Sequence, residues 1–198
     1  FLLVWLINVY NFIDGVDGLA ITGAMLILLT LLLTLIIANH TSALIPLFLI
    51  LFISCLGFLF FNWPKASIFM GDSGSIFLGY CFGAFIIYSL MMGEISFLTW
   101  LVVFGYYLGD TTTTTIIRTV RGKKWNEAHR SHAYQNLARI LDNHSIVTIG
   151  VIIYHILWLL PLAVWTVLKP DLASIAVILA FLPSIILAIK FGPLFSME

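Results

Sequence analysis

The sequence predicts an all-α fold, a polytopic bundle of transmembrane helices with six full spans and the end of a seventh. Hydrophobic residues make up 62% of the 198 residues and charged residues only 9%. The mean hydropathy is +1.11. A chain with so few polar groups cannot cover a water-soluble surface, so lipid is the solvent that this composition indicates. Apolar stretches long enough to cross about 30 Å of hydrocarbon also recur along the chain.

Six of these stretches are long enough to be full spans, and short polar connections separate them. They are residues 19–38, 44–61, 76–92, 97–117, 147–168 and 172–189. Residues 1–7 are apolar but too short to cross, and no initiating Met precedes them. We therefore expect residues 1–198 to be a single membrane domain, the C-terminal part of a larger protein that begins with further spans.

The basic residues are unevenly distributed among the connections. If the connections alternate between the two sides, eight of the nine Lys and Arg residues lie on one side, and Lys169 lies alone on the other. This asymmetry predicts that the first side is cytoplasmic. The cytoplasmic segments would be 8–18, 62–75, 118–146 and the tail from residue 190.

The first polar motif occupies residues 8–20, between two apolar stretches. A charged residue inside the membrane costs at least about 2.5 to 3.5 kcal/mol, so carboxylates at its boundary indicate function. Gly15 and Gly18 are expected to interrupt a helix here and to leave backbone groups lining a polar cavity. The alternative is an ordinary capped loop that joins two spans. The four polar side chains follow one another at intervals of three residues: Asn8, Asn11, Asp14 and Asp17.

The second motif is Gly-Asp-Ser-Gly-Ser at residues 71–75, directly before a span. Asp72 could simply cap the following helix, whose dipole favours negative charge. Its loop, however, is predicted to face the same side as Asp14 and Asp17. Three carboxylates that converge would repel one another and favour a bound cation. Oxygen ligands without Cys indicate a hard ion such as Mg²⁺.

The third motif lies in the longest connection, where His129, Arg130 and His132 form a compact set of donors suited to phosphate oxygens. Zinc binding is the alternative for the two His residues, but they lack nearby Cys partners. Residues 126–141 have the composition of a short amphipathic helix. Asp110 is placed well inside an expected span, so it requires a polar partner or a cavity.

These three motifs resemble those of the polyprenyl-phosphate N-acetylhexosamine-1-phosphate transferases, glycosyltransferase family 4, which include phospho-N-acetylmuramoyl-pentapeptide transferase. Residues 8–20 are similar to the family's Asn-x-x-Asn-x-x-Asp-Gly-x-Asp-Gly-Leu-Ala motif, residues 71–79 to its Gly-Asp-Ser/Thr-Gly-Ser motif, and residues 128–135 to its His-rich loop. The O-antigen-initiating branch is the most similar. The motifs occur in the family's order and are predicted to lie on one side.

The resemblance implies transfer of N-acetylhexosamine 1-phosphate from a UDP-sugar to polyprenyl (undecaprenyl) phosphate. The products would be a lipid-diphospho-sugar, which begins O-antigen or another cell-envelope polysaccharide, and UMP. It implies a multi-pass protein of the bacterial inner (plasma) membrane with a cytoplasmic active site and Mg²⁺ as cofactor, with Mn²⁺ as an alternative ion. No nucleic-acid partner is expected, and a homodimer is compatible with this interpretation.

The resemblance also implies roles for individual residues. Asn11 and Asp72 would bind the metal, and Asp14, Asp17 and Asp72 would be the catalytic carboxylates. Substrate would be bound by Asn8, Asn11, His129, Arg130 and His132.

The sequence departs from the family in one respect. Relatives carry an Asp-Asp pair in an earlier cytoplasmic loop, and this chain begins after that position. We therefore expect the isolated chain 1–198 to be inactive. The alternative function is a membrane transporter or carrier, which predicts an ion or anion site near the middle of the bilayer and an inverted repeat.

Overall fold

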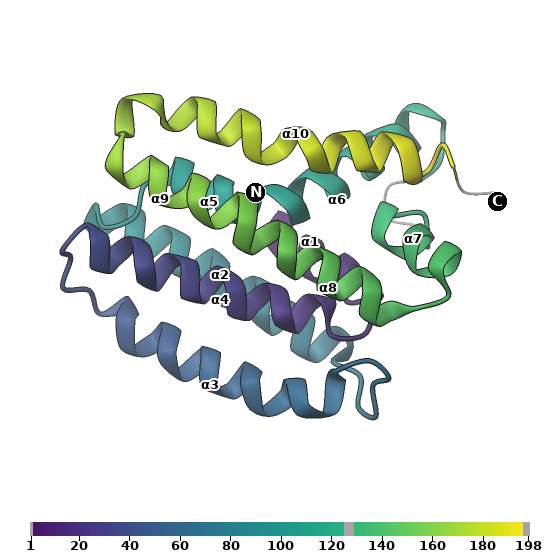
Figure 1. The fold of residues 1–198 in the computed structure, drawn as a ribbon, viewed down its shortest axis with the longest axis horizontal. Coiled ribbons are helices and arrows are strands. Elements are labelled where there is room, and N and C mark those ends of the chain that lie inside the picture. Colours follow the sequence, from purple (N-terminus) through teal and green to yellow (C-terminus); the bar gives the residue numbers. More distant parts are fainter. Residues whose placement is uncertain (1, 125–128, 196–198) are drawn as a thin grey trace.

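The computed structural model describes residues 2–124 and 129–195, and within these ranges the protein is all-helical, without a strand. Figure 1 shows long helices lying side by side in an elongated bundle. The helices are α1 (Leu2–Ile13), α2 (Leu19–Ile37), α3 (Leu44–Asn62), α4 (Gly71–Met92), α5 (Phe97–Val103), α6 (Gly105–Val120), α7 (Ala133–Leu141), α8 (His144–Tyr154), α9 (Leu160–Leu168) and α10 (Ala173–Phe191). A π-helical turn at His155–Leu159 joins α8 to α9.

Five helical segments of the described chain are long and apolar enough to cross a membrane. They are Leu19–Ile37, Leu44–Asn62, Gly71–Met92, His144–Leu168 and Pro170–Phe191. The all-helical, multi-pass character predicted from the composition is confirmed. Six full spans are more than the structure shows, because the expected span at 97–117 is not one apolar helix.

That segment is divided into α5 and α6 at Phe104. Two glycines beyond the division allow α10 to approach closely: a Cβ on Gly105 would lie 3.0 Å from Ala180, and one on Gly109 would lie 2.0 Å from Ser184 Oγ. The Ser184 hydroxyl also donates a 3.0 Å hydrogen bond to the carbonyl of Gly105. A hydroxyl inserted beside the backbone ladder of a helix is a known cause of kinks. The rest of α6 is polar, with Asp110 and Thr111 buried.

The connections alternate between the two ends of the bundle (Figure 1). The α1–α2, α3–α4 and α6–α8 connections lie at the same end as the C-terminus, whereas the α2–α3, α4–α5 and α9–α10 connections lie at the opposite end. The first of these ends is called the motif end below, because all three polar motifs belong to it. Every basic residue except Lys169 belongs to segments at the motif end.

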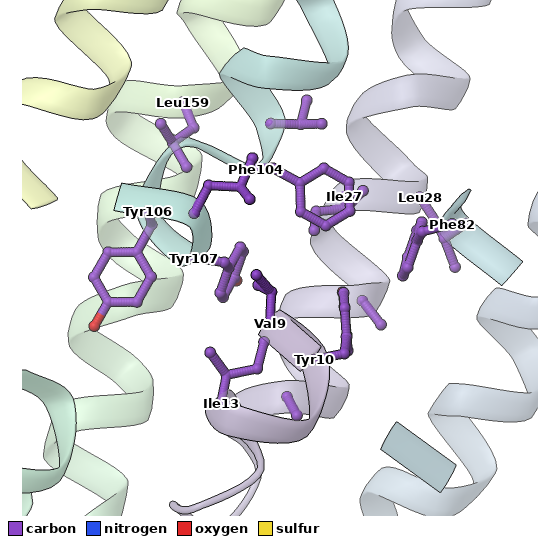
Figure 2. Close-up of a cluster of buried hydrophobic side chains, with 14 of the residues drawn as sticks. Val9, Tyr10, Ile13, Ile27, Leu28, Phe82, Phe104, Tyr106, Tyr107 and Leu159 are labelled. Atoms are coloured by element: carbon purple, nitrogen blue, oxygen red, sulfur yellow. The ribbon is translucent and has the colours of Figure 1, made fainter. Parts of the chain in front are cut away.

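The short helix α1 packs against its neighbours through Leu6, Val9, Tyr10 and Ile13, and this packing positions its C-terminal end. Figure 2 shows Val9, Tyr10 and Ile13 of α1 within a cluster of buried hydrophobic side chains. The ring centroids of Tyr10 and Phe82 lie 5.1 Å apart. Where α1 and α4 come closest, Gly79 of α4 faces the α1 backbone, and a Cβ at Gly79 would lie 2.6 Å from the Cα of Ile7. Helices α1 and α4 therefore have a fixed relation, and they carry the first two motifs.

The amphipathic helix expected over 126–141 is shorter than predicted. Helix α7 begins at Ala133, residues 129–132 precede it without helical structure, and 126–128 lie outside the described residues. The side chain of Gln135 accepts a 3.3 Å hydrogen bond from the backbone N–H of His132, which satisfies one of the free donors at the start of a helix. The residues before α7 are thereby available to line a site.

Candidate active site

A cleft of about 530 Å³ lies at the motif end. The end of α1, the start of α4 and the segment before α7 form its walls, so all three sequence motifs contribute to it. Its lining residues are Asn11, Phe12, Asp14, Gly15, Phe69, Gly71, Asp72, His129, Arg130, His132 and Gln135. This position at an end of the bundle differs from the midplane site that a transporter predicts.

Asn11 and Asp72 form the contact between the first two motifs. The amide Nδ2 of Asn11 donates a 2.9 Å hydrogen bond to Oδ1 of Asp72 and lies 3.3 Å from Oγ of Ser75. Asn11 belongs to the last turn of α1, and Asp72 to the first turn of α4. The predicted proximity of these two residues, 61 positions apart, is thus present in the structure.

Asp14 is a half-buried carboxylate in the same cleft. Its pKa is raised to about 6, mainly by burial and also by the negative charges of Asp72 and Asp17, while a hydrogen bond from the backbone of Gly71 acts in the opposite direction. The carboxylates of the first two motifs therefore repel one another in a partly dry site, as expected from the sequence.

Asp17 points into a neighbouring cleft of about 620 Å³, lined also by Lys65 and Arg139. Its Oδ2 accepts a 3.1 Å hydrogen bond from the backbone N–H of Ala66 and lies 3.3 Å from Nδ1 of His144. The chain reverses between Asp14 and Asp17, and Gly18 has the left-handed φ of +74° that favours glycine. Helix α1 ends at Ile13, so the interruption predicted near Gly15 and Gly18 is present.

Asn8 does not line either cleft. Its Nδ2 donates a 2.7 Å hydrogen bond to the carbonyl of Val4, one turn earlier in α1. The structure thus brings together Asn11, Asp14 and Asp72 in one cleft, whereas Asp17 lines the adjoining cleft. The amide of Asn8 forms its hydrogen bond within its own helix.

The His-rich segment, residues 129–132, forms another wall of the cleft, and residues of α6 contact it. His129, Arg130 and His132 line the cleft, and the two imidazole rings stack with centroids 4.9 Å apart. Nδ1 of His132 lies 2.9 Å from Oδ2 of Asp110, which is the polar partner that this intramembrane carboxylate requires. Arg118 of α6 reaches Oγ of Ser131 at 3.4 Å.

Three further lining residues were not assigned a role from the sequence. Phe12 contacts the ring of His132, with centroids 5.7 Å apart. Gln135 approaches Gly15 so closely that a Cβ there would lie 2.5 Å from its Nε2. Phe69 also lines the cleft. The only sequence signal for them is their position inside or next to the polar motifs, since apolar residues in a membrane protein are not distinctive.

The donors in the cleft suit a hard cation with few protein ligands. Residues 2–124 and 129–195 contain no group of three or more His, Cys, Asp or Glu residues arranged to hold a metal ion. Mg²⁺ needs only one or two carboxylates, because water and substrate phosphate complete its coordination. Asp72 and the side-chain oxygen of Asn11 fit that requirement, and Asp14 adds a second carboxylate to the same cleft.

Comparisons with known proteins agree with the motifs. The family described as Glycosyl transferase family 4 matches residues 1–90. The probable undecaprenyl-phosphate N-acetylglucosaminyl 1-phosphate transferase of Bacillus subtilis (strain 168) is 33% identical over 137 residues, which cover 68% of this chain and 38% of that protein.

The phospho-N-acetylmuramoyl-pentapeptide-transferases of Leuconostoc mesenteroides and Leuconostoc citreum are 34% and 37% identical over 130 and 131 residues, 64% of this chain in each case. The chain matches 38% of the length of both relatives. The residues matched by the family include the first two motifs. In the structure of this chain, one cleft brings these two motifs together with the third. The chain is therefore a multi-pass membrane protein of glycosyltransferase family 4.

Proposed function

We propose that the protein carrying this sequence transfers N-acetylhexosamine 1-phosphate from a UDP-sugar to polyprenyl phosphate. The reaction would take place at the cytoplasmic face of the bacterial inner membrane and begin O-antigen or another envelope polysaccharide. One observation carries the proposal: Asn11, Asp14 and Asp72 face His129, Arg130 and His132 across one cleft. The names of the related transferases support the class of reaction.

The chemistry requires charge neutralisation and positioning more than it requires a protein nucleophile. A phosphate oxygen of the lipid acceptor forms a bond to the phosphorus attached to the sugar, the diphosphate bond of the donor breaks, and UMP leaves with the bridging oxygen. Asn11 and Asp72 would hold Mg²⁺, which supplies positive charge to the diphosphate when bound. Arg130 and the two His residues would donate hydrogen bonds to phosphate oxygens.

The two clefts suggest how the donor lies. Asp14 is in the cleft with the diphosphate-binding residues, and Asp17 faces the adjoining cleft that Lys65 and Arg139 also line. We assign Asp14 to the reacting end of the nucleotide sugar and Asp17 to its nucleotide end. A polyprenyl phosphate in the cytoplasmic leaflet would have its charged head at the motif end of the bundle.

The test uses membranes that contain the full-length protein, polyprenyl phosphate, and UDP-N-acetylglucosamine or UDP-N-acetylgalactosamine carrying ³²P in the phosphate next to the sugar. Transfer of sugar 1-phosphate moves ³²P into the lipid extract, whereas transfer of the sugar alone leaves it in the aqueous phase. We expect Asp72→Asn to reduce lipid labelling by at least about 100-fold, because it removes the anionic ligand that would hold Mg²⁺, the ion that would supply positive charge to the reacting diphosphate.

The matched control is Asp171→Asn, which removes a carboxylate from the turn at the opposite end. This variant should label lipid like the natural protein. Unchanged labelling in Asp72→Asn would contradict the metal site, and absence of lipid ³²P with the natural protein would contradict the transferase.

A further inference from the structure

Asp110 is a buried carboxylate whose two oxygens both serve the His-rich segment. It lies in α6 with 2% of its surface exposed. Oδ1 accepts a 3.0 Å hydrogen bond from the backbone N–H of Ala133, the first residue of α7. Oδ2 lies 2.9 Å from Nδ1 of His132. The carboxylate therefore fixes both the start of α7 and the side chain that precedes it.

The contact with Asp110 determines which nitrogen of His132 carries a proton. An ionised carboxylate only accepts hydrogen bonds, so Nδ1 must carry the hydrogen between these two residues. The His132 ring also stacks on two neighbouring rings, with its centroid 4.9 Å from that of His129 and 5.5 Å from that of Tyr134. In such pairs the carboxylate sets the tautomer and the orientation of the imidazole.

The opposite nitrogen, Nε2, is left available to a ligand. It is buried and has no hydrogen-bond partner among the described residues, although His132 lines the cleft. A buried polar atom without a hydrogen bond is destabilising. Once protonated, Nε2 would donate a hydrogen bond to a phosphate oxygen and remove this destabilisation. The resulting imidazolium would lie between two anions, Asp110 on one side and the phosphate on the other.

We propose that Asp110 is a positioning residue of the active site, which holds His132 in the Nδ1–H tautomer and presents Nε2 to a phosphate oxygen of the donor. This role rests on the proposed function. Asp110 does not touch the substrate itself. It acts through His132 and couples an intramembrane helix to the segment that binds the diphosphate.

Asp110→Asn separates this role from simple packing. The backbone N–H of Ala133 is a fixed donor, so the amide oxygen of Asn remains there and the NH₂ group faces Nδ1 of His132. That nitrogen must then be unprotonated, and the proton moves to Nε2. The geometry is nearly conserved, but the tautomer is reversed.

The experiment measures ¹⁵N chemical shifts of His132 in the full-length protein labelled at histidine, assigned by the signal that His132→Asn removes. We expect a protonated Nδ1 and an unprotonated Nε2 in the natural protein without substrate, and the reverse in Asp110→Asn. The kcat/KM for lipid labelling should fall by about 10- to 100-fold in this variant. The amide of Asn donates to Nδ1 and prevents its protonation, so His132 can no longer become the imidazolium that binds phosphate most strongly. Asp171→Asn should change neither quantity.

The outcomes distinguish this proposal from the proposed function. An Nε2–H tautomer in the natural protein would overturn the role of Asp110, even if Asp110→Asn does not fold. A folded Asp110→Asn with unchanged His132 shifts would overturn it as well. If the natural protein shows the Nδ1–H tautomer but never labels lipid, the proposed function fails while the pairing of Asp110 with His132 stands.

Discussion

Asn11, Asp14 and Asp17 are three residues apart in the sequence, yet their side chains have different surroundings. Asn11 is the only one of the three within α1, and its amide donates a hydrogen bond to Asp72. Asp14 follows the end of the helix and remains in the same cleft. Asp17 lies beyond a reversal of the chain and contacts the backbone of Ala66. Spacing alone therefore does not tell which of them share a ligand.

The raised pKa of Asp14 predicts a dependence of stability on pH. Burial, together with the nearby carboxylates, raises the pKa from its ordinary value of 3.8 to about 6, so the folded state holds this proton more tightly than the unfolded state. Stability then decreases as pH rises from about 4 to 6, and the cost of the charged carboxylate is complete above that range.

Asp14→Asn should remove this cost in metal-free buffer. We expect the variant to be more stable than the natural protein at pH 8, by about 1 kcal/mol after allowance for solvent screening of a half-buried group. The gain should shrink as pH falls from 6 toward 4. Thermal unfolding in detergent with a chelator measures it, with Asp171→Asn as control. A lower unfolding temperature for Asp14→Asn at pH 8 would show that the ionised carboxylate of Asp14 does not destabilise the folded state.

At the scale of the elements, the packing of α1 against α4 determines the distance between Asn11 and Asp72. Gly79 permits the approach, and Gly83 one turn later faces Leu3 in the same way. Two small residues four positions apart are typical of close helix contacts in membranes. Close helix packing therefore accounts for the glycine pair.

Gly79→Ala should separate the two helices and disturb the cleft. Its Cβ would lie 2.6 Å from the Cα of Ile7, and backbone cannot yield as a flexible side chain can. We expect a loss of about 1–3 kcal/mol in stability together with reduced lipid labelling. Gly57→Ala is the matched control, since a Cβ at Gly57 in α3 meets nothing within 4 Å. Equal behaviour of the two variants would argue against the role of Gly79.

At the scale of the whole molecule, charge and chemistry are gathered at the same end. The motif end carries the two polar clefts and every basic residue except Lys169. Such an asymmetry orients a membrane protein with its basic end in the cytoplasm. It also favours the approach of anionic substrates to that end.

Cysteine labelling tests this orientation. In a protein without other cysteines, Lys65→Cys at the motif end should react with a membrane-impermeant maleimide only after the cells are opened. Asp171→Cys at the opposite end should react in intact spheroplasts. The reverse pattern would place the clefts outside the cytoplasm and exclude a nucleotide-sugar donor from them.

The sequence by itself determined the all-helical membrane class, the three polar motifs, their common side and the need of Asp110 for a partner. These follow from composition and local patterns, because a membrane-spanning helix makes its backbone hydrogen bonds within one segment and is recognised by the hydrophobicity of that segment alone. The motifs also indicated the family, which the comparisons support.

Only the tertiary structure decided which side chains meet. The contacts of Asn11 with Asp72, of Asp110 with His132 and of Asp17 with Ala66 join residues 61, 22 and 49 positions apart. They depend on which helix packs against Gly79 and on where the chain reversal before α2 directs Asp17, and the local sequence pattern specifies neither partner. The division of the expected span at Phe104 has the same origin, since it accompanies the contact with Ser184 of a distant helix.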